Sequence, residues 1–295
     1  MSRRTLRAAW LLLGAACAGG TATPPSASPA PGAPPSAARP ADAPRPLEPS
    51  AQANERVRYP RSGSGRQRYA FLRRDSIVVT MPSGEEQLQE TASTSYLTLS
   101  WTAADSGVRF EAVVDSVVND PDFPVPPVQL DSVRGSQWAF RQATTGAITG
   151  VVGRPASFRG EQLRDQLLLL YPILPEGGAA VYTSWRDSTA APTRISAFPA
   201  EAVVQLEARA EPREGRGLRI VTTRQRSAEG QSTLATQAVT VRATGADSLV
   251  TELDPDARVL DVTVHRVTDF VVELPAIGQT VPGREVSFLR MTLLR

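Results

Sequence analysis

Apolar and polar residues alternate with a period of two in many short runs from about Tyr59 onward, and this alternation restricts the chain to folds built from β-strands. Successive side chains of a strand point to opposite faces, so a strand with one buried face carries this pattern. Clear runs surround Phe110, Phe140 and Val262. Residue pairs that favour turns separate the runs, among them Thr145-Gly146, Glu229-Gly230 and Thr244-Gly245.

One segment between the strand-like runs has the spacing of a helix instead. Ser157 is suited to cap its first turn, and Pro172 is suited to end it. The apolar residues of this segment are Leu163, Leu167, Leu170 and Tyr171. They recur at the intervals that place side chains on one face of a helix.

These patterns predict a mainly β fold, in which a large antiparallel sheet forms a sandwich or an incomplete barrel. One helix, at about 157–171, is expected between two strand-rich halves, 55–153 and 178–295. A chain of this length falls within the range of single all-β domains, so we expect 55–295 to be one domain. Two closely packed halves are the alternative.

The start of the chain has the pattern of a bacterial signal peptide that ends at a lipid-modified cysteine. Three arginines precede a short apolar run, Ala8–Ala16, and Cys17, the only cysteine of the chain, follows it. The run is shorter than the roughly 20 residues that span a bilayer. We therefore expect residues 1–16 to be removed and Cys17 to carry fatty acyl chains such as palmitate. The expected location is the cell envelope, on the outer membrane or the periplasmic face, and ordinary cleavage with release as a soluble protein is the alternative.

Residues 17–54 are rich in proline and alanine and contain few large apolar side chains. Such a composition buries too little apolar surface to offset the entropy of ordering. The sequence thus predicts a disordered linker that holds the folded domain away from the membrane.

Net charge argues against nucleic acid as a partner. The chain has 32 basic residues, all of them arginine, and 30 acidic ones. Removal of Arg3, Arg4 and Arg7 with the signal peptide leaves a net charge of about −1, whereas nucleic-acid-binding domains are usually strongly basic.

Residues for catalysis or metal binding are sparse, and no enzyme, cofactor or metal site is predicted. His265 is the only histidine and lies within a strand pattern, with Asp261 and Asp269 on the same side by parity. No serine occurs in the turn that serine hydrolases use, so we interpret His265 as a partly exposed strand residue. One histidine and one cysteine are too few for the usual zinc sites.

Several features in a fixed order resemble an uncharacterised β-rich family of secreted bacterial lipoproteins. They are the segment Gly135–Phe140, the turn Thr145-Gly146, the end of the helical segment at Tyr171–Pro175, and then Gly178 and Trp185. The resemblance covers about 66–295 and implies a secreted, lipid-anchored β domain, with no functional residues to transfer. At the level of architecture the chain is also similar to periplasmic carrier lipoproteins, which fold a curved sheet around an apolar cavity.

Two functions follow as hypotheses. The first is a non-catalytic structural or protein-interaction role in the envelope, with the membrane as partner through Cys17 and another envelope protein bound by the domain. The second is a carrier or sensor of an apolar, lipid-like ligand. For that role the candidate ligand-binding residues are those of the helical segment, Leu163, Leu167, Leu170 and Tyr171. A carrier needs inward-facing side chains that leave a void, whereas a structural module fills it.

Overall fold

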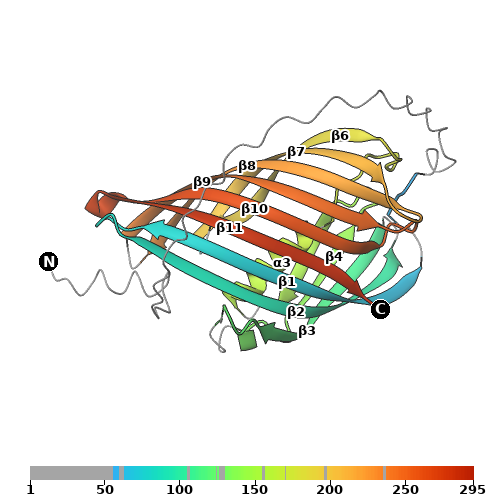
Figure 1. Ribbon diagram of the computed structural model, residues 1–295, viewed down its shortest axis with the longest axis horizontal. Helices are drawn as coiled ribbons and strands as arrows, with labels where there is room; N and C mark the ends of the chain where they lie inside the picture. The colour runs from blue at the N-terminus through green and yellow to red at the C-terminus, as the bar shows by residue number, and fades with distance from the viewer. Residues whose placement is uncertain are drawn as a thin grey trace, which may run out of the picture. The chain divides into compact units, whose positions relative to one another are not determined.

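In the residues that the computed structural model describes, eleven antiparallel strands form one continuous sheet (Figure 1). The structure describes residues 56–59, 63–104, 107–123, 125, 130–154, 157–169, 171–195, 198–234 and 237–295. In the first half of the domain the strands are β1 (Ser64–Thr80), β2 (Glu86–Ala104), β3 (Gly107–Asn119), β4 (Gln137–Gln142) and β5 (Ile148–Arg154). In the second half they are β6 (Ser184–Ile195), β7 (Phe198–Pro212), β8 (Leu218–Leu234), β9 (Gln237–Leu253), β10 (Val259–Leu274) and β11 (Gln279–Leu294). The helix α3 (Phe158–Leu169) lies between the two halves in the chain, and a 3-10 turn, η2 (Pro275–Ile277), links β10 to β11.

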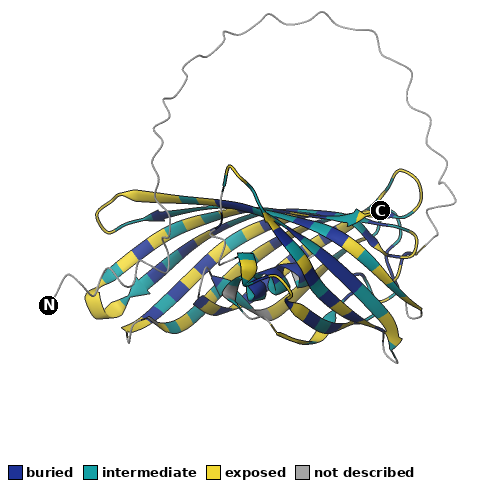
Figure 2. Ribbon diagram, turned by 90° about the horizontal axis from the view of Figure 1, so that it is seen from below, coloured by how far each residue is buried: buried dark blue, intermediate teal, exposed yellow. Residues whose placement is uncertain are grey.

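The order of the strands joins the two halves at the centre of the sheet. It runs β5-β4-β3-β2-β1-β11-β10-β9-β8-β7-β6, so the first and last strands pair with each other. The two edges, β5 and β6, are consecutive in sequence and are connected through α3. The connection must therefore pass from one edge of the sheet to the other. Figure 2 shows α3 lying inside the curve of the sheet.

Burial follows strand parity, as expected for a sheet with one covered face. In β7 every second residue from Phe198 to Ala210 is buried, and those between are exposed. The buried set faces inward, toward α3, and we call this the inner face. Near α3 the inner face forms the main hydrophobic core, in which Leu163 and Leu167 of the helix pack with Phe71, Leu97 and Leu289 of the sheet.

The predicted fold class is confirmed, and the sheet is open rather than folded into a sandwich. In the described residues β5 pairs only with β4 and β6 only with β7, so the sheet remains an incomplete barrel. The helix is confirmed at Phe158–Leu169, slightly shorter than the predicted 157–171. Its predicted cap is also present, since the Ser157 hydroxyl accepts a hydrogen bond from the Gly160 amide at 3.1 Å. Tyr171 lies beyond the helix in a buried loop.

Two of the predicted turns are wrong. Glu229-Gly230 lies inside β8 and Thr244-Gly245 inside β9, each an uninterrupted strand of 17 residues. Both glycines allow close packing instead. A β-carbon on Gly230 would lie 2.1 Å from the carbonyl oxygen of Pro199, and one on Gly245 would lie 2.6 Å from the carbonyl oxygen of Val267. Glycine inside a strand often marks such a close approach.

Candidate functional site

The inner face carries a cavity of about 490 Å³ at the end of the sheet where β1 and β10 begin. Its walls combine aromatic side chains with polar and charged ones. The aromatic side chains that line it are Tyr59, Tyr69, Trp101, Phe110 and Tyr171. This void is much larger than the two cavities that border α3, which measure about 70 and 30 Å³. We call it the aromatic cavity.

The aromatic walls support one another through edge and tilted contacts. The Tyr59 and Tyr171 rings meet edge to face, with centroids 6.5 Å apart, and the Phe110 and Tyr171 centroids are 6.0 Å apart. Phe110 stacks on Phe140, 5.2 Å away with nearly parallel rings. Such pairs stabilise a fixed arrangement beyond simple burial of area. The cavity is thus bounded by preorganised side chains.

Segment 56–59 closes one side of the aromatic cavity by adding to the loop that follows α3. Val57 and Ala179 exchange two backbone hydrogen bonds, of 2.8 and 3.0 Å. The Tyr59 hydroxyl donates to the carbonyl oxygen of Pro172 at 2.9 Å. This loop holds Tyr171, so two walls of the cavity are fixed by the same set of contacts.

Gly65 of β1 makes room for another wall. A β-carbon at this position would lie only 2.2 Å from the Trp101 ring on the neighbouring strand β2. Without it the indole can lie flat over the backbone of β1. On the same strand the Tyr69 hydroxyl donates to the carbonyl oxygen of Val259 at 2.9 Å, which ties β1 to the start of β10.

The phenols in the cavity stay neutral near pH 7. Burial, and then the neighbouring Tyr171, raise the pKa of Tyr59 well above its ordinary value. Burial likewise raises the pKa of Tyr69 and of Tyr171. The permanent charges stand at the rim instead, on Arg56, Arg58 and Arg258. Arg258 is partly neutralised by Asp256, at 3.4 Å.

A second feature of the inner face is a row of buried polar side chains that crosses the middle of the sheet. Arg224 of β8, Asp247 of β9 and Arg266 of β10 are directly opposite one another in register. The row continues through Ser287 of β11 to Asp75 of β1, whose carboxylate accepts a hydrogen bond from the Ser287 hydroxyl at 2.8 Å. Apolar residues of the inner face lie on both sides of this row.

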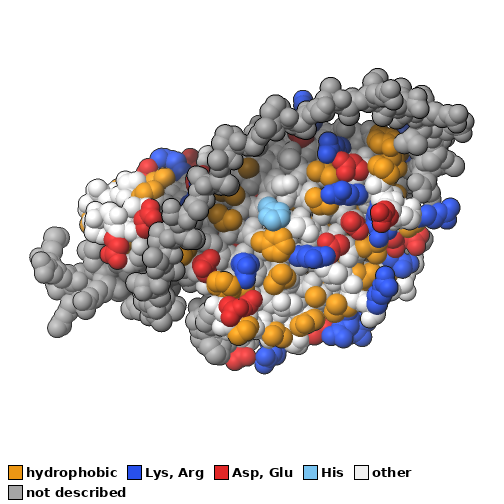
Figure 3. All heavy atoms as spheres, viewed as in Figure 1, with side chains coloured by type: hydrophobic (Ala, Val, Ile, Leu, Met, Phe, Trp, Pro, Cys, Tyr) orange, Lys and Arg blue, Asp and Glu red, His pale blue; other side chains and the backbone are white. Residues whose placement is uncertain are grey.

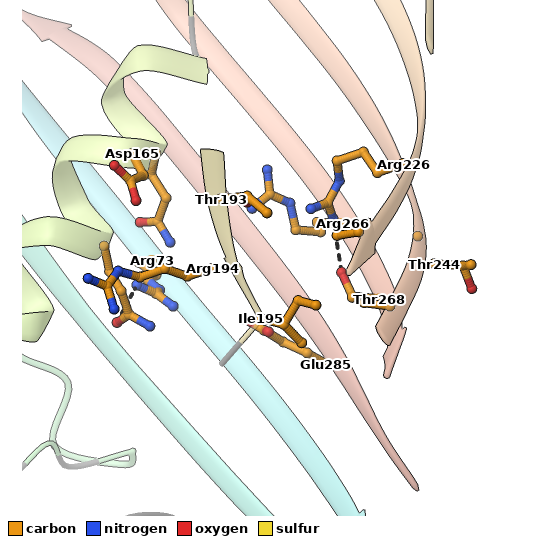
Figure 4. A pocket seen from close by; sticks show the side chains of 15 residues that line it. Arg73, Asp165, Thr193, Arg194, Ile195, Arg226, Thr244, Arg266, Thr268 and Glu285 are labelled. Atoms are coloured by element: carbon orange, nitrogen blue, oxygen red, sulfur yellow. Dashed lines mark hydrogen bonds between the residues drawn. The ribbon is translucent and has the colours of Figure 1, made fainter. Parts of the chain in front are cut away.

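Asp247 is the hub of this polar row. Its carboxylate is fully buried and lies 3.1 Å from the Nε atom of Arg266 and 3.2 Å from an Nη atom of Arg226. The Arg226 guanidinium also donates to the Thr268 hydroxyl at 2.9 Å (Figure 4). We call Arg224, Arg226, Arg266 and Asp247 the arginine cluster.

The residues proposed from the sequence as ligand-binding lie in different surroundings. Leu163 and Leu167 are buried in the core between α3 and the sheet, with 5% and 4% of their surfaces exposed. Tyr171 lines the aromatic cavity. Leu170 and Cys17 lie outside the described residues. Of the four residues, the structure thus brings Tyr171 to the aromatic cavity.

His265 lies on the outer face of β10, exposed as predicted, and its ring packs on Phe288 at 5.0 Å. It is the single pale-blue side chain in Figure 3, among mixed charges. Its two candidate partners are engaged elsewhere, since Asp261 pairs with Arg290 at 3.0 Å and Asp269 lies 3.7 Å from Arg284.

Among the described residues, no three histidine, cysteine or acidic side chains are grouped closely enough to hold a metal ion. Within the same residues, none of the helices combines the length and the apolar character that crossing a bilayer requires. No family model matches the chain, and no curated protein sequence matches it. The resemblance to secreted lipoproteins therefore stays a prediction.

Proposed function

We propose that this chain is an envelope lipoprotein, anchored through acyl chains on Cys17, whose curved sheet acts as a non-catalytic carrier or sensor of an apolar ligand. The observation that carries the proposal is the aromatic cavity of about 490 Å³. Small-molecule sites usually occupy roughly 300–1,000 Å³ and are lined by apolar and aromatic side chains with a few polar groups. The aromatic cavity has this size, and its five aromatic side chains offer an apolar contact surface beside the polar groups that share its lining.

The arrangement of α3 limits where such a ligand is held. Leu163 and Leu167 already fill the space between the helix and the sheet, so the ligand is expected to enter from the open end of the sheet. There its apolar part would contact Trp101 and Phe110, and a polar or anionic end would lie near Arg56 and Arg58 at the rim. Tyr171 would connect the ligand to the loop that follows α3.

A filling variant tests this proposal. Gln67 lines the aromatic cavity, so Gln67→Trp should occupy the space that the ligand needs. Gln225→Trp is a matched control, because Gln225 is exposed on the outward parity of β8. The measurement is binding of the fluorescent apolar probe N-phenyl-1-naphthylamine to the full chain and to both variants, together with their Tm.

We expect the native chain and Gln225→Trp to bind the probe alike, and Gln67→Trp to bind it at least tenfold more weakly. The Tm of Gln67→Trp should fall somewhat, because the Tyr69 hydroxyl loses its hydrogen bond to Gln67 at 2.8 Å. Equal binding by Gln67→Trp would show that the probe is held elsewhere and would refute the aromatic cavity as the ligand site.

A protein-interaction role is the second candidate, and the open edge of the sheet favours it. In the described residues β6 is paired on one side only. A groove of about 800 Å³ crosses β6, β7 and β8 next to this edge, and Trp185, Arg186 and Glu207 are among the residues that line it. An unpaired edge can accept a strand from a partner. A photo-crosslinking side chain at the exposed position Thr189 tests this role. A single adduct with one envelope protein would support it, and the absence of any adduct would count against it.

A further inference from the structure

Gln142, the last residue of β4, brings a buried polar group to the wall of the aromatic cavity. The inward positions of β4 are Trp138, Phe140 and Gln142, and the first two belong to the hydrophobic core. The Phe140 ring stacks on Phe110, which also lines the cavity. Only 2% of the Gln142 surface is exposed. An amide therefore occupies an inward position at which the pattern of the strand would place an apolar side chain.

The side-chain nitrogen of Gln142 has no acceptor in the protein. This Nε2 atom is buried and makes no hydrogen bond among the described residues. The strand register explains why, because Val108 of β3 and Ile148 of β5 lie directly opposite Gln142, and neither side chain can accept a hydrogen bond. Buried amides are normally hydrogen-bonded, and an unpaired one costs folding free energy. The N–H groups of Gln142 are thus available to a ligand in the cavity.

Two other buried donors of the cavity are already committed to the protein. The Tyr59 hydroxyl donates to the carbonyl oxygen of Pro172, and the Tyr69 hydroxyl donates to that of Val259, each at 2.9 Å. A hydrocarbon in the cavity would leave the Gln142 amide unpaired, whereas a carbonyl oxygen accepts from an amide N–H. Sites built to form a hydrogen bond with a ligand reject analogues that lack the bonding group.

We propose that Gln142 makes the aromatic cavity selective for apolar ligands that carry a carbonyl oxygen, which accepts a hydrogen bond from the Gln142 amide. This inference rests on the proposed function and adds the chemical class of the ligand. The apolar part of the ligand lies against Trp101 and Phe110. The carbonyl oxygen belongs either to a neutral group, such as a ketone or an ester, or to a carboxylate, whose charge Arg56 and Arg58 at the rim favour.

Three probes of nearly the same size and shape test the selectivity. The compound 1-acetylnaphthalene carries a neutral carbonyl oxygen, and 1-isopropenylnaphthalene has a methylene group in place of that oxygen. Naphthalene-1-carboxylate carries a charged pair of oxygens instead. Each probe is used to displace N-phenyl-1-naphthylamine from the full chain carrying Cys17→Ser, which should need no detergent.

Gln142→Met is the main variant, because methionine has nearly the length of glutamine and no N–H donor. Gln166→Met is the matched control. Gln166 of α3 is also buried and has an unpaired amide oxygen among the described residues, but it does not line the aromatic cavity. Replacing an unpaired buried amide by an apolar group should leave the Tm unchanged or higher. A clear fall in the Tm of Gln142→Met would show that the protein itself uses this amide and would count against the proposal.

We expect 1-acetylnaphthalene to bind at least tenfold more tightly than 1-isopropenylnaphthalene, both in the starting protein and in Gln166→Met. In Gln142→Met this preference should disappear. If naphthalene-1-carboxylate binds more tightly than the ketone and also loses affinity in Gln142→Met, the ligands are carboxylates; the opposite order assigns neutral carbonyl compounds.

Two results would overturn the inference while leaving the aromatic cavity as an apolar site. One is equal binding of the ketone and the hydrocarbon by the starting protein, and the other is a preference for the ketone that survives in Gln142→Met. Failure of N-phenyl-1-naphthylamine and of all three probes to bind would instead refute the proposed function together with this inference.

Discussion

Asp247 is expected to be the most sensitive single charge in the domain, and Asp247→Asn tests this. The substitution preserves shape but removes the Asp247 charge, which faces Arg224, Arg226 and Arg266. The Asp247 carboxylate is fully buried and lies 3.1 Å from Arg266 and 3.2 Å from Arg226. The variant would leave Arg226 and Arg266 without the carboxylate that they share.

The structure sets the size of the effect. At about 4 Å and an effective dielectric constant of about 20, each pair of opposite charges is worth roughly 4 kcal/mol before desolvation. Removing one partner of a buried pair generally costs about 3–5 kcal/mol, because the remaining charge is left uncompensated. Domains are stable by only about 5–15 kcal/mol. Asp247→Asn should thus remove a large part of the folding free energy.

The assay is urea unfolding at neutral pH in chloride buffer, followed by tryptophan fluorescence and circular dichroism. Asp269→Asn is the matched control on the neighbouring strand, since Asp269 lies 3.7 Å from Arg284 and both side chains are mostly exposed. Exposed pairs contribute less than about 1 kcal/mol. If Asp247→Asn and Asp269→Asn lower the free energy of unfolding by the same small amount, the arginine cluster does not depend on Asp247 and the reasoning fails.

Three further outcomes are expected. Gly230→Ala should lower the free energy of unfolding by about 1–3 kcal/mol, because its β-carbon would clash with the backbone of β7; an unchanged urea midpoint would contradict this packing. Burial raises the pKa of Tyr59, Tyr69 and Tyr171 above the ordinary value of 10, so the stability that each contributes is lost as pH rises above about 10. The ultraviolet absorbance change of these three phenols should therefore appear only when the protein unfolds. Titration of all the tyrosines in the folded protein would disprove this. Cys17→Ser should move the chain from the membrane fraction to the soluble fraction, and continued membrane association would refute the lipid anchor.

The fold class could be predicted because a strand with one buried face alternates apolar and polar residues along its length. The helix could be placed for a similar reason, since Ser157 and Pro172 mark its ends chemically. Strand lengths were predicted less well. Gly230 and Gly245 stand in dipeptides that are typical of turns, and only their neighbours in space, Pro199 and Val267, show that close packing explains them.

The aromatic cavity could not be predicted from the sequence, because its walls come from distant parts of the chain. Tyr59 and Tyr171 meet only through the pairing of Val57 with Ala179, which no local pattern indicates. The sequence favoured the helical segment as the ligand site because its leucines lie close together in the sequence. In the structure Leu163 and Leu167 pack into the core, and the void lies beyond the end of the helix.

Strand parity predicts which face the cluster arginines lie on, but not which residues they contact there. In β8 the inward positions run from Leu218 and Ile220 to Arg224 and Arg226, so apolar spacing alone would place two arginines on the covered face. A single inward arginine can extend its charged end to water along its own stem. The strand register instead holds these side chains together in the middle of the sheet, because Arg224 lies opposite Asp247 and Asp247 lies opposite Arg266. A sheet that only needed a core would have apolar residues there, as it does on both sides of the row. The pairing of β8, β9 and β10 thus fixes this polar row in the middle of the sheet.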